Sequence, residues 1–159
     1  MSVKIAMLNE FPEYAPVLAY WTYHEWYRKR NIDFRLVLKS YQARLKNITP
    51  PLSFLVLYDS FPVGMVSLKE HDIISRKDLC PWLSSLYVIP EYRGRGIGSS
   101  LIATLTDRAR DLGFNSLYLF LGNSNQEYLE NLYQKKGWLY LTDTMDNDGC
   151  DTKIFFRNL

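Results

Sequence analysis

The segment from Leu86 to Leu105, LYVIPEYRGRGIGSSLIATL, constrains the fold more than any other part of the chain. Residues 82–89 form an apolar run that predicts a strand. Residues 97–112 repeat apolar side chains at helical spacing, which predicts a helix with one apolar face. A further apolar run follows at 116–121. Strand, helix and strand in this order form a crossover that is nearly always right-handed, with the two strands parallel.

The other segments complete one α/β domain over residues 1–159, the size of an ordinary domain. We expect a mixed, mostly antiparallel central sheet that contains the parallel βαβ unit, with helices on both faces. No repeat or linker interrupts the chain. The expected elements are a strand at 3–8, a helix from Pro12, a helix capped by Asp33, a hairpin of 52–59 and 63–71, a helix at 126–136, and strands at 138–143 and 152–158.

Glycines alternate with arginines in the turn before the central helix, at Arg93, Gly94, Arg95, Gly96 and Gly98. A nucleotide-hydrolase loop needs Lys after its last glycine, and the dinucleotide fingerprint needs glycine where Ser99 stands. A connection with positive φ angles explains one or two of the glycines, but not all of them. Backbone amides at a helix N-terminus attract anions, and the arginines add positive charge. The turn therefore predicts an anion site for a phosphate or diphosphate.

Two motifs in the chain resemble the signatures of the GNAT superfamily of N-acyltransferases. Residues 93–98, RGRGIG, resemble its R/Q-x-x-G-x-G/A turn, and the preceding LYVIPEY is similar to the strand and turn that lead into it. Residues 132–138, LYQKKGW, resemble its second signature, a helix end of the form aromatic-Tyr-x-x-x-Gly-aromatic. The expected order of elements also fits the family fold over nearly the whole chain.

This resemblance implies that the chain binds acetyl-CoA as a co-substrate. Backbone groups of Leu86 and Val88 would pair with the pantetheine arm, and an amide near Leu86 or Tyr87 would polarise the thioester carbonyl. Asn125 would contact the cofactor, beside Gln126, which stands where many family members have Asn. The diphosphate would lie on the glycine turn, whose expected cofactor-binding residues are Arg93, Gly94, Arg95, Gly96, Ile97, Gly98 and Ser99.

The same resemblance implies direct transfer of the acetyl group to an amine in a ternary complex. Tyr133, the tyrosine of the second signature, would protonate the leaving thiolate as general acid; the alternative is a tyrosine that only packs. Because a free alkylamine is mostly protonated at neutral pH, a base is also expected. Some relatives carry a carboxylate at the end of the second central strand, but this chain does not. The candidates in its place are Glu70, the base we assign, and His71 and Glu25.

The acceptor is expected to be a small-molecule or peptide amine. Helix residues such as Trp21 and Trp26 either pack in the core or wall the acceptor site, which would favour an apolar or aromatic acceptor. Two other functions stay open: transfer of a longer acyl group, and a non-catalytic module that binds an acyl-CoA as a sensor. The oligomeric state stays open; a homodimer is one candidate, because dimers are common among relatives.

The composition excludes several classes of binding partner. A net charge of +2 gives no global attraction to nucleic acid or to an anionic membrane, and no run of residues is long and apolar enough to span a bilayer. The two cysteines, Cys80 and Cys150, have no metal-ligand spacing, so we expect no metal. Reduced thiols and the lack of a signal peptide at the start of this sequence predict a cytoplasmic protein.

Overall fold

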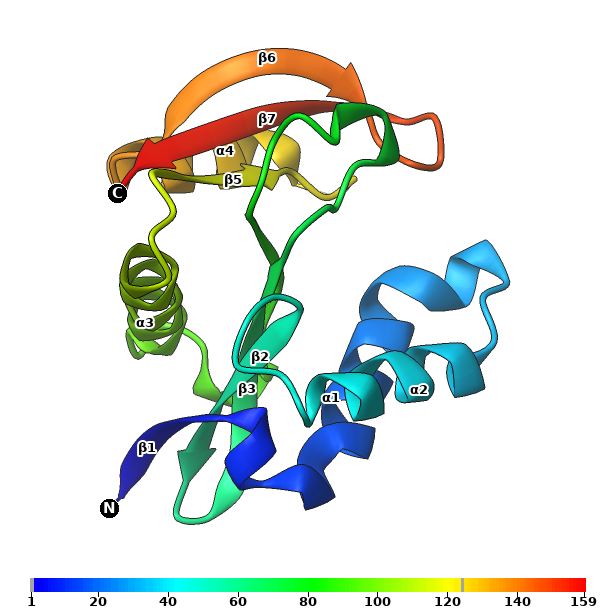
Figure 1. The fold of residues 1–159 in the computed structure, drawn as a ribbon, viewed down its shortest axis with the longest axis vertical. Coiled ribbons are helices and arrows are strands. Elements are labelled where there is room, and N and C mark those ends of the chain that lie inside the picture. The colour runs from blue at the N-terminus through cyan, green and yellow to red at the C-terminus, as the bar shows by residue number, and fades with distance from the viewer. Residues whose placement is uncertain (1, 124) are drawn as a thin grey trace. The chain divides into compact units, whose positions relative to one another are not determined.

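A seven-stranded sheet organises the computed structural model, which describes residues 2–123 and 125–159 (Figure 1). The strand order is β1-β2-β3-β4-β5-β7-β6. β4 and β5 are parallel, whereas β1–β2, β2–β3, β5–β7 and β6–β7 are antiparallel pairs. The mixed, mostly antiparallel sheet with one parallel crossover confirms the fold class that the sequence predicts.

The helices and strands follow the expected order along the chain. The strands are β1 (Val3–Met7), β2 (Leu52–Tyr58), β3 (Phe61–Lys69), β4 (Trp82–Val88), β5 (Ser116–Phe120), β6 (Leu139–Met145) and β7 (Asp151–Asn158). The longer helices are α1 (Ala15–Thr22), α2 (Phe34–Arg44), α3 (Ile97–Asp111) and α4 (Gln126–Lys135).

The hairpin of β2 and β3 is tighter than expected. Asp59 and Ser60 form its turn, with φ angles of 46° and 72°. Positive φ at both central residues gives a turn whose twist matches the twist of the paired strands. Strand β3 therefore begins at Phe61 and ends at Lys69, so that Glu70 lies just beyond it.

The helix expected from Pro12 forms, but it is not regular, because the segment changes its hydrogen-bond pattern three times. A 3₁₀ turn (Pro12–Tyr14) leads into α1, a π-turn called η3 (Tyr23–Tyr27) follows, and a 3₁₀ turn (Arg28–Arg30) ends the segment. In the π-turn the amide of Arg28 donates to the carbonyl of Tyr23. A π-turn widens the helix by about one residue, which turns its side chains to a new direction.

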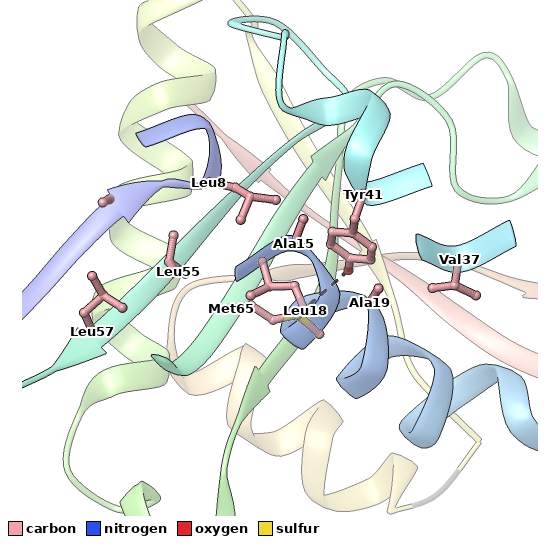
Figure 2. Packing of buried hydrophobic residues seen from close by; sticks show 10 residues of the cluster. Leu8, Ala15, Leu18, Ala19, Val37, Tyr41, Leu55, Leu57 and Met65 are labelled. Atoms are coloured by element: carbon pink, nitrogen blue, oxygen red, sulfur yellow. Dashed lines mark hydrogen bonds between the residues drawn. The ribbon is translucent and has the colours of Figure 1, made fainter. Parts of the chain in front are cut away.

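Two compact units make up the chain: Met1–Leu68 with Ser85–Leu105, and Lys69–Ser84 with Thr106–Leu159. In the first unit, α1 and α2 lie side by side, and Leu18 and Tyr41 point toward Met65 of β3 (Figure 2). Full burial of an aliphatic side chain contributes about 1.5–3 kcal/mol. The cluster therefore holds both helices on β2 and β3; its buried members are Ala6, Leu8, Ala15, Leu18, Ala19, Val37, Tyr41, Leu55, Leu57 and Met65.

A buried arginine extends this packing. Arg44, at the end of α2, is only 6% exposed, and its guanidinium lies 4.2 Å from the centre of the Tyr41 ring. It donates to the hydroxyls of Ser53 on β2 (3.1 Å) and Ser67 on β3 (2.9 Å). A cation at a helix C-terminus is also favoured by the helix dipole. Arg44 thus ties α2 to both strands of the hairpin.

The second unit has its own core around Trp82, at the start of β4. Trp82 pairs with Tyr118 in the parallel ladder, and its indole nitrogen donates to the carbonyl of Leu79 at 2.8 Å. Ile73, Leu79 and Ile154 are buried against it. On the same unit, an ion pair of 3.0 Å between Lys153 and Glu130 joins β7 to α4.

Candidate functional site

The glycine turn begins directly after a 3₁₀ turn (Pro90–Tyr92) that follows β4. Gly94 and Gly96 have φ angles of +75° and +81°, in the left-handed region. Residues with a Cβ rarely adopt this region, so both glycines are required by the path of the backbone. They turn the chain so that α3 starts at Ile97.

Gly98 is different, because the protein itself does not require it. It lies in the first turn of α3, and its φ is not in the left-handed region. Apart from the two neighbouring residues and the nearby backbone of α3, a Cβ placed on Gly98 would meet no described atom within 4 Å. A glycine in a helix costs about 1 kcal/mol relative to alanine. The glycine thus leaves open space at a helix start, where N–H groups lack partners within the helix and attract anions.

The two arginines of the turn contact the strand and the 3₁₀ turn before it. Arg93 donates from Nε to the carbonyl of Val88 at 2.8 Å and lies 5.5 Å from the centre of the Tyr87 ring. Arg95 donates to the carbonyl of Glu91 at 3.1 Å and lies 4.7 Å from the Tyr92 ring. Both side chains therefore brace the turn against β4 and the 3₁₀ turn, in addition to the positive charge they bring.

The middle of β4 departs from regular strand geometry. Ser85 has a φ of +53°, a strained value for a residue that is not glycine. Beyond it, β4 runs close to β3: a Cβ on Gly64 would come within 3.1 Å of the Tyr87 carbonyl, and the amide of Ile89 donates to the carbonyl of Val63 at 3.0 Å. The sequence contains no signal for the left-handed Ser85.

The side chain of Tyr87 is surrounded by residues of the first unit. The rings of Trp21 and Trp26 lie with their centres 5.5 Å and 6.5 Å from the Tyr87 ring. Burial raises the pKa of the Tyr87 phenol, and the nearby carboxylate of Glu25 raises it further. The structure thus brings Glu25 and the Tyr87 phenol close together, with Arg93 on the same ring.

In the second unit, the second motif forms the C-terminal cap of α4. The amide of Trp138 donates to the carbonyl of Tyr133 at 3.0 Å, and the amide of Gly137 donates to that of Gln134 at 3.1 Å. Gly137 has a φ of +88°. This is the Schellman pattern, in which a left-handed glycine ends the helix and the next residue packs back on it. Accordingly, the Trp138 ring lies 6.0 Å from the Tyr133 ring, edge to face.

The cap keeps Tyr133 almost wholly out of water. Its side chain is 8% exposed, and among the described residues its hydroxyl has no hydrogen-bond partner. Burial raises the pKa of Tyr133 to about 12. The phenol is therefore fully protonated at neutral pH and keeps an O–H group that can be donated.

Both motifs fall within a known family. The Acetyltransferase (GNAT) family matches residues 9–138, which is most of the chain and includes the glycine turn and the cap of α4. The chain belongs to the GNAT acetyltransferase family. The resemblance of the two motifs is thereby confirmed.

Individual relatives are more distant. Over 62 residues the chain is 39% identical to the thialysine N-epsilon-acetyltransferase of Bos taurus, a match that covers 39% of this chain and 36% of that protein's length. A Salmonella typhimurium protein whose structure holds its cofactor acetyl-CoA has a TM-score of 0.75 and 18% identity, over 100% of this chain and 95% of that one. An aminoglycoside 6'-N-acetyltransferase complexed with coenzyme A has a TM-score of 0.74 and 14% identity, over 98% and 96%. At these identities the two structures establish a shared fold.

Two further predicted site residues of this GNAT chain, Glu70 and Asn125, are exposed. Glu70 lies beyond the end of β3 in the second unit. Burial of the Cys80 thiol raises the pKa of that thiol, and the charge of Glu70 raises it further. Asn125 is the left-handed residue before α4, with a φ of 58°. The side-chain amide of Gln126 donates to the carbonyl of Asp151 at 3.1 Å, so it holds α4 to β7. Glu70 as base and Asn125 as a cofactor contact stay predictions.

Two further findings concern metals and membranes. Across residues 2–123 and 125–159, no group of three or more His, Cys, Asp or Glu side chains is arranged to hold a metal ion. Over those same ranges, none of the helices of this GNAT domain is both long and apolar enough to cross a membrane.

Proposed function

We propose that the chain transfers the acetyl group of acetyl-CoA to an amine by direct attack in a ternary complex. The observation that carries this proposal is Gly98, a helix-start glycine that neither its φ angle nor its neighbours require. Its open space lets a bulky anion approach the first turn of α3 closely, as the diphosphate of coenzyme A would need. The family membership and the acetyl-CoA and coenzyme A found in structural relatives support the same ligand.

Strand β4 would hold the other end of the co-substrate. It runs through Leu86, Tyr87 and Val88 directly into the glycine turn. Its backbone would bind the pantetheine arm as an added strand, and an amide near Leu86 or Tyr87 would donate to the thioester carbonyl. The left-handed Ser85 supports this role, because a residue with positive φ changes the direction of the backbone groups that follow it.

Tyr133 would serve the leaving group. The thioester supplies an activated acetyl carbon; the C–N bond forms there, the C–S bond breaks, and the electron pair goes to sulfur. The phenol of Tyr133 donates its proton to that sulfur. The amine loses one N–H proton through water to the base, for which Glu70 is the candidate. The base then releases that proton to water and the phenol regains one from water, so the step balances. The hydroxyl stays protonated throughout the neutral range, so its proton is present for this step.

Calorimetry with acetyl-CoA tests the binding half of the proposal, with ATP and NAD as controls. We expect acetyl-CoA to bind selectively, with a Kd on the order of micromolar. If all three ligands bind equally, or if acetyl-CoA does not bind, the glycine turn is a generic anion site or a structural turn.

Release of free thiol in the presence of amines tests the transfer half. Turnover of acetyl-CoA with formation of the amide supports the acetyltransferase. Tight binding without turnover of any amine would instead indicate the acyl-CoA sensor. Faster turnover of a longer acyl-CoA than of acetyl-CoA would replace the acetyl group in the proposal with that longer group.

A further inference from the structure

We propose that Arg44 holds a small anion at the end of α2, beside the hairpin of β2 and β3. The anion contacts the edge of the guanidinium that is formed by Nε and Nη2. Arg44, Ser53 and Ser67 all belong to the first compact unit. The inference goes beyond the proposed function, because it involves neither the glycine turn nor the backbone of β4.

The charge of Arg44 is buried without a carboxylate to neutralise it. The residue is 6% exposed. Its Nη1 donates to Ser53 and Ser67, at 3.1 Å and 2.9 Å, and its Nη2 donates to Ser40 at 3.2 Å. Within residues 2–123 and 125–159, no carboxylate forms an ion pair with Arg44, and its buried Nε has no hydrogen-bond acceptor. A buried charge is unfavourable unless it is paired, so this cation lacks the partner that would stabilise it best.

Two other arginines of the chain show what this edge of a guanidinium binds. Arg76 donates from Nε and Nη2 to the two carboxylate oxygens of Asp78, at 2.9 Å and 2.8 Å. Arg35 uses the same two nitrogens on the carboxylate of Asp33. The planar fork of donors matches an anion in charge and in geometry. In Arg44 the same edge has an unpaired Nε and a serine hydroxyl at Nη2, so this is the edge where an anion fits.

The polar groups around Arg44 supply no full negative charge. Ser53 and Ser67 are buried, and their hydroxyl oxygens lie 2.7 Å apart, so one hydroxyl donates to the other. The Tyr41 ring, 4.2 Å from the guanidinium, and the carbonyls at the end of α2 carry only partial negative charge. A water molecule at Nε would accept a hydrogen bond but bring no charge. An anion does both, so the site favours an anion over water.

Burial limits the size of the ligand, and Ser40 shows how the ligand reaches the site. Ser40 is exposed on α2 and accepts from Nη2, which lies on the same edge of the guanidinium as Nε. This edge is therefore the one that faces the surface. Because so little of Arg44 is exposed, the opening suits a monatomic anion rather than a phosphate or diphosphate. Chloride is the probe that matches this size and charge.

Urea unfolding in sodium chloride and in sodium gluconate at the same ionic strength tests the inference. Gluconate is too bulky for the site, and urea, unlike guanidinium chloride, brings no anion of its own. If one chloride binds only the folded protein, the folding equilibrium constant is expected to rise about tenfold for each tenfold increase in chloride above its Kd. Equal stability in the two salts at every concentration would overturn the inference.

Two variants locate the effect. Arg44→Met removes the charge but keeps a long side chain that can pack on Tyr41, and it is expected to abolish the difference between the two salts. Arg95→Met is the matched control, because the same substitution removes a cation from the glycine turn, where an anion is also expected. It is expected to keep the chloride response. A response that survives Arg44→Met and disappears in Arg95→Met would place the anion at the glycine turn and overturn the inference.

Diffraction at the bromide absorption edge locates the anion in the unmodified protein, so it does not depend on whether a variant folds. Crystals soaked in sodium bromide are expected to show an anomalous peak within hydrogen-bond distance of Nε of Arg44. This peak, together with a chloride response in solution, would support the site. No peak at Arg44, or a peak without any chloride response in solution, which would mean binding at crystal concentration only, would overturn it.

Discussion

At the start of α3 and at the end of α4, a glycine stands within one turn of a helix terminus. Gly137 adopts a φ of +88°, and the two cap hydrogen bonds that end α4 depend on this angle. Gly98 adopts no left-handed φ, and a Cβ would have open space at both glycines. The fold therefore requires the first glycine, and we propose that the second leaves room for a ligand.

This difference shows that glycines in the two motifs of one family can have different structural roles. The cap of α4 determines where Tyr133 lies, because its carbonyl accepts the Trp138 amide and its ring packs on the Trp138 ring. At the start of α3, by contrast, there is open space where a Cβ on Gly98 would lie. Replacing Gly137 is therefore expected to change stability, and replacing Gly98 to change ligand affinity.

The largest expected effect concerns the residue that the Gly137 cap positions. Tyr133→Phe removes the proton donor but keeps the ring that packs on Trp138. We expect kcat to fall about a hundredfold, the low end for loss of a general acid. Calorimetry is expected to give nearly the same Kd for acetyl-CoA. A loss of binding, with normal turnover for each bound molecule, would refute the proton-donor role.

The burial of Tyr133 also predicts a pH dependence of stability. A tyrosine in the unfolded chain has a pKa of about 10, whereas the folded value is about 12. Between these values the folded state binds more protons than the unfolded state, so stability falls as pH rises. Two pKa units correspond to about 2–3 kcal/mol of unfolding free energy, lost from pH 10 to 12.

Urea unfolding at several alkaline pH values measures this loss, and Tyr133→Phe is the reference because its side chain cannot ionise. As pH rises from 10 to 12, the free energy of unfolding of the unmodified protein is expected to fall relative to that of Tyr133→Phe. Parallel curves would show that the phenol is not desolvated as the structure indicates.

The sequence predicted those parts of the molecule that depend on local chemistry. Apolar spacing gave the order of helices and strands, Asp33 caps α2 as expected by accepting from the Arg35 amide, and both glycine motifs lie at helix ends. Each of these features is determined by residues close together in the chain. The parallel pairing of β4 and β5 followed from the geometry of the crossover.

The contacts of Trp21 and Trp26 with the Tyr87 ring could not be predicted, since they join residues distant in sequence. The π-turn that follows α1 has no sequence signal of its own. The left-handed Ser85 is a similar case, as nothing in the sequence Trp82–Val88 distinguishes it from a regular strand. The burial of Arg44 could not be predicted either, because it depends on hydrogen bonds to Ser53 of β2 and Ser67 of β3.

Gly137→Ala sharpens the comparison of the two glycines. A Cβ at a φ of +88° costs about 1–2 kcal/mol, and the cap hydrogen bonds would weaken. We expect the urea midpoint to fall accordingly, with a Kd for acetyl-CoA that is nearly unchanged. A variant as stable as the unmodified protein would show that the cap tolerates a side chain.

Gly98→Ala is expected to give the opposite result. Alanine is the better helix former, and its Cβ meets no described atom within 4 Å, so stability is expected to rise by about 0.5–1 kcal/mol. The same methyl group occupies the space through which a diphosphate would reach the first-turn amides, so the Kd for acetyl-CoA is expected to rise about tenfold, or ~1.4 kcal/mol.

Ala103→Gly is the matched control, because Ala103 is exposed on the same helix. This substitution removes a Cβ, and it is expected to lower stability and to leave the affinity for acetyl-CoA unchanged. A Gly98→Ala protein that is more stable and binds acetyl-CoA as before would show that no ligand uses this space, and the two glycines would then differ only in conformation.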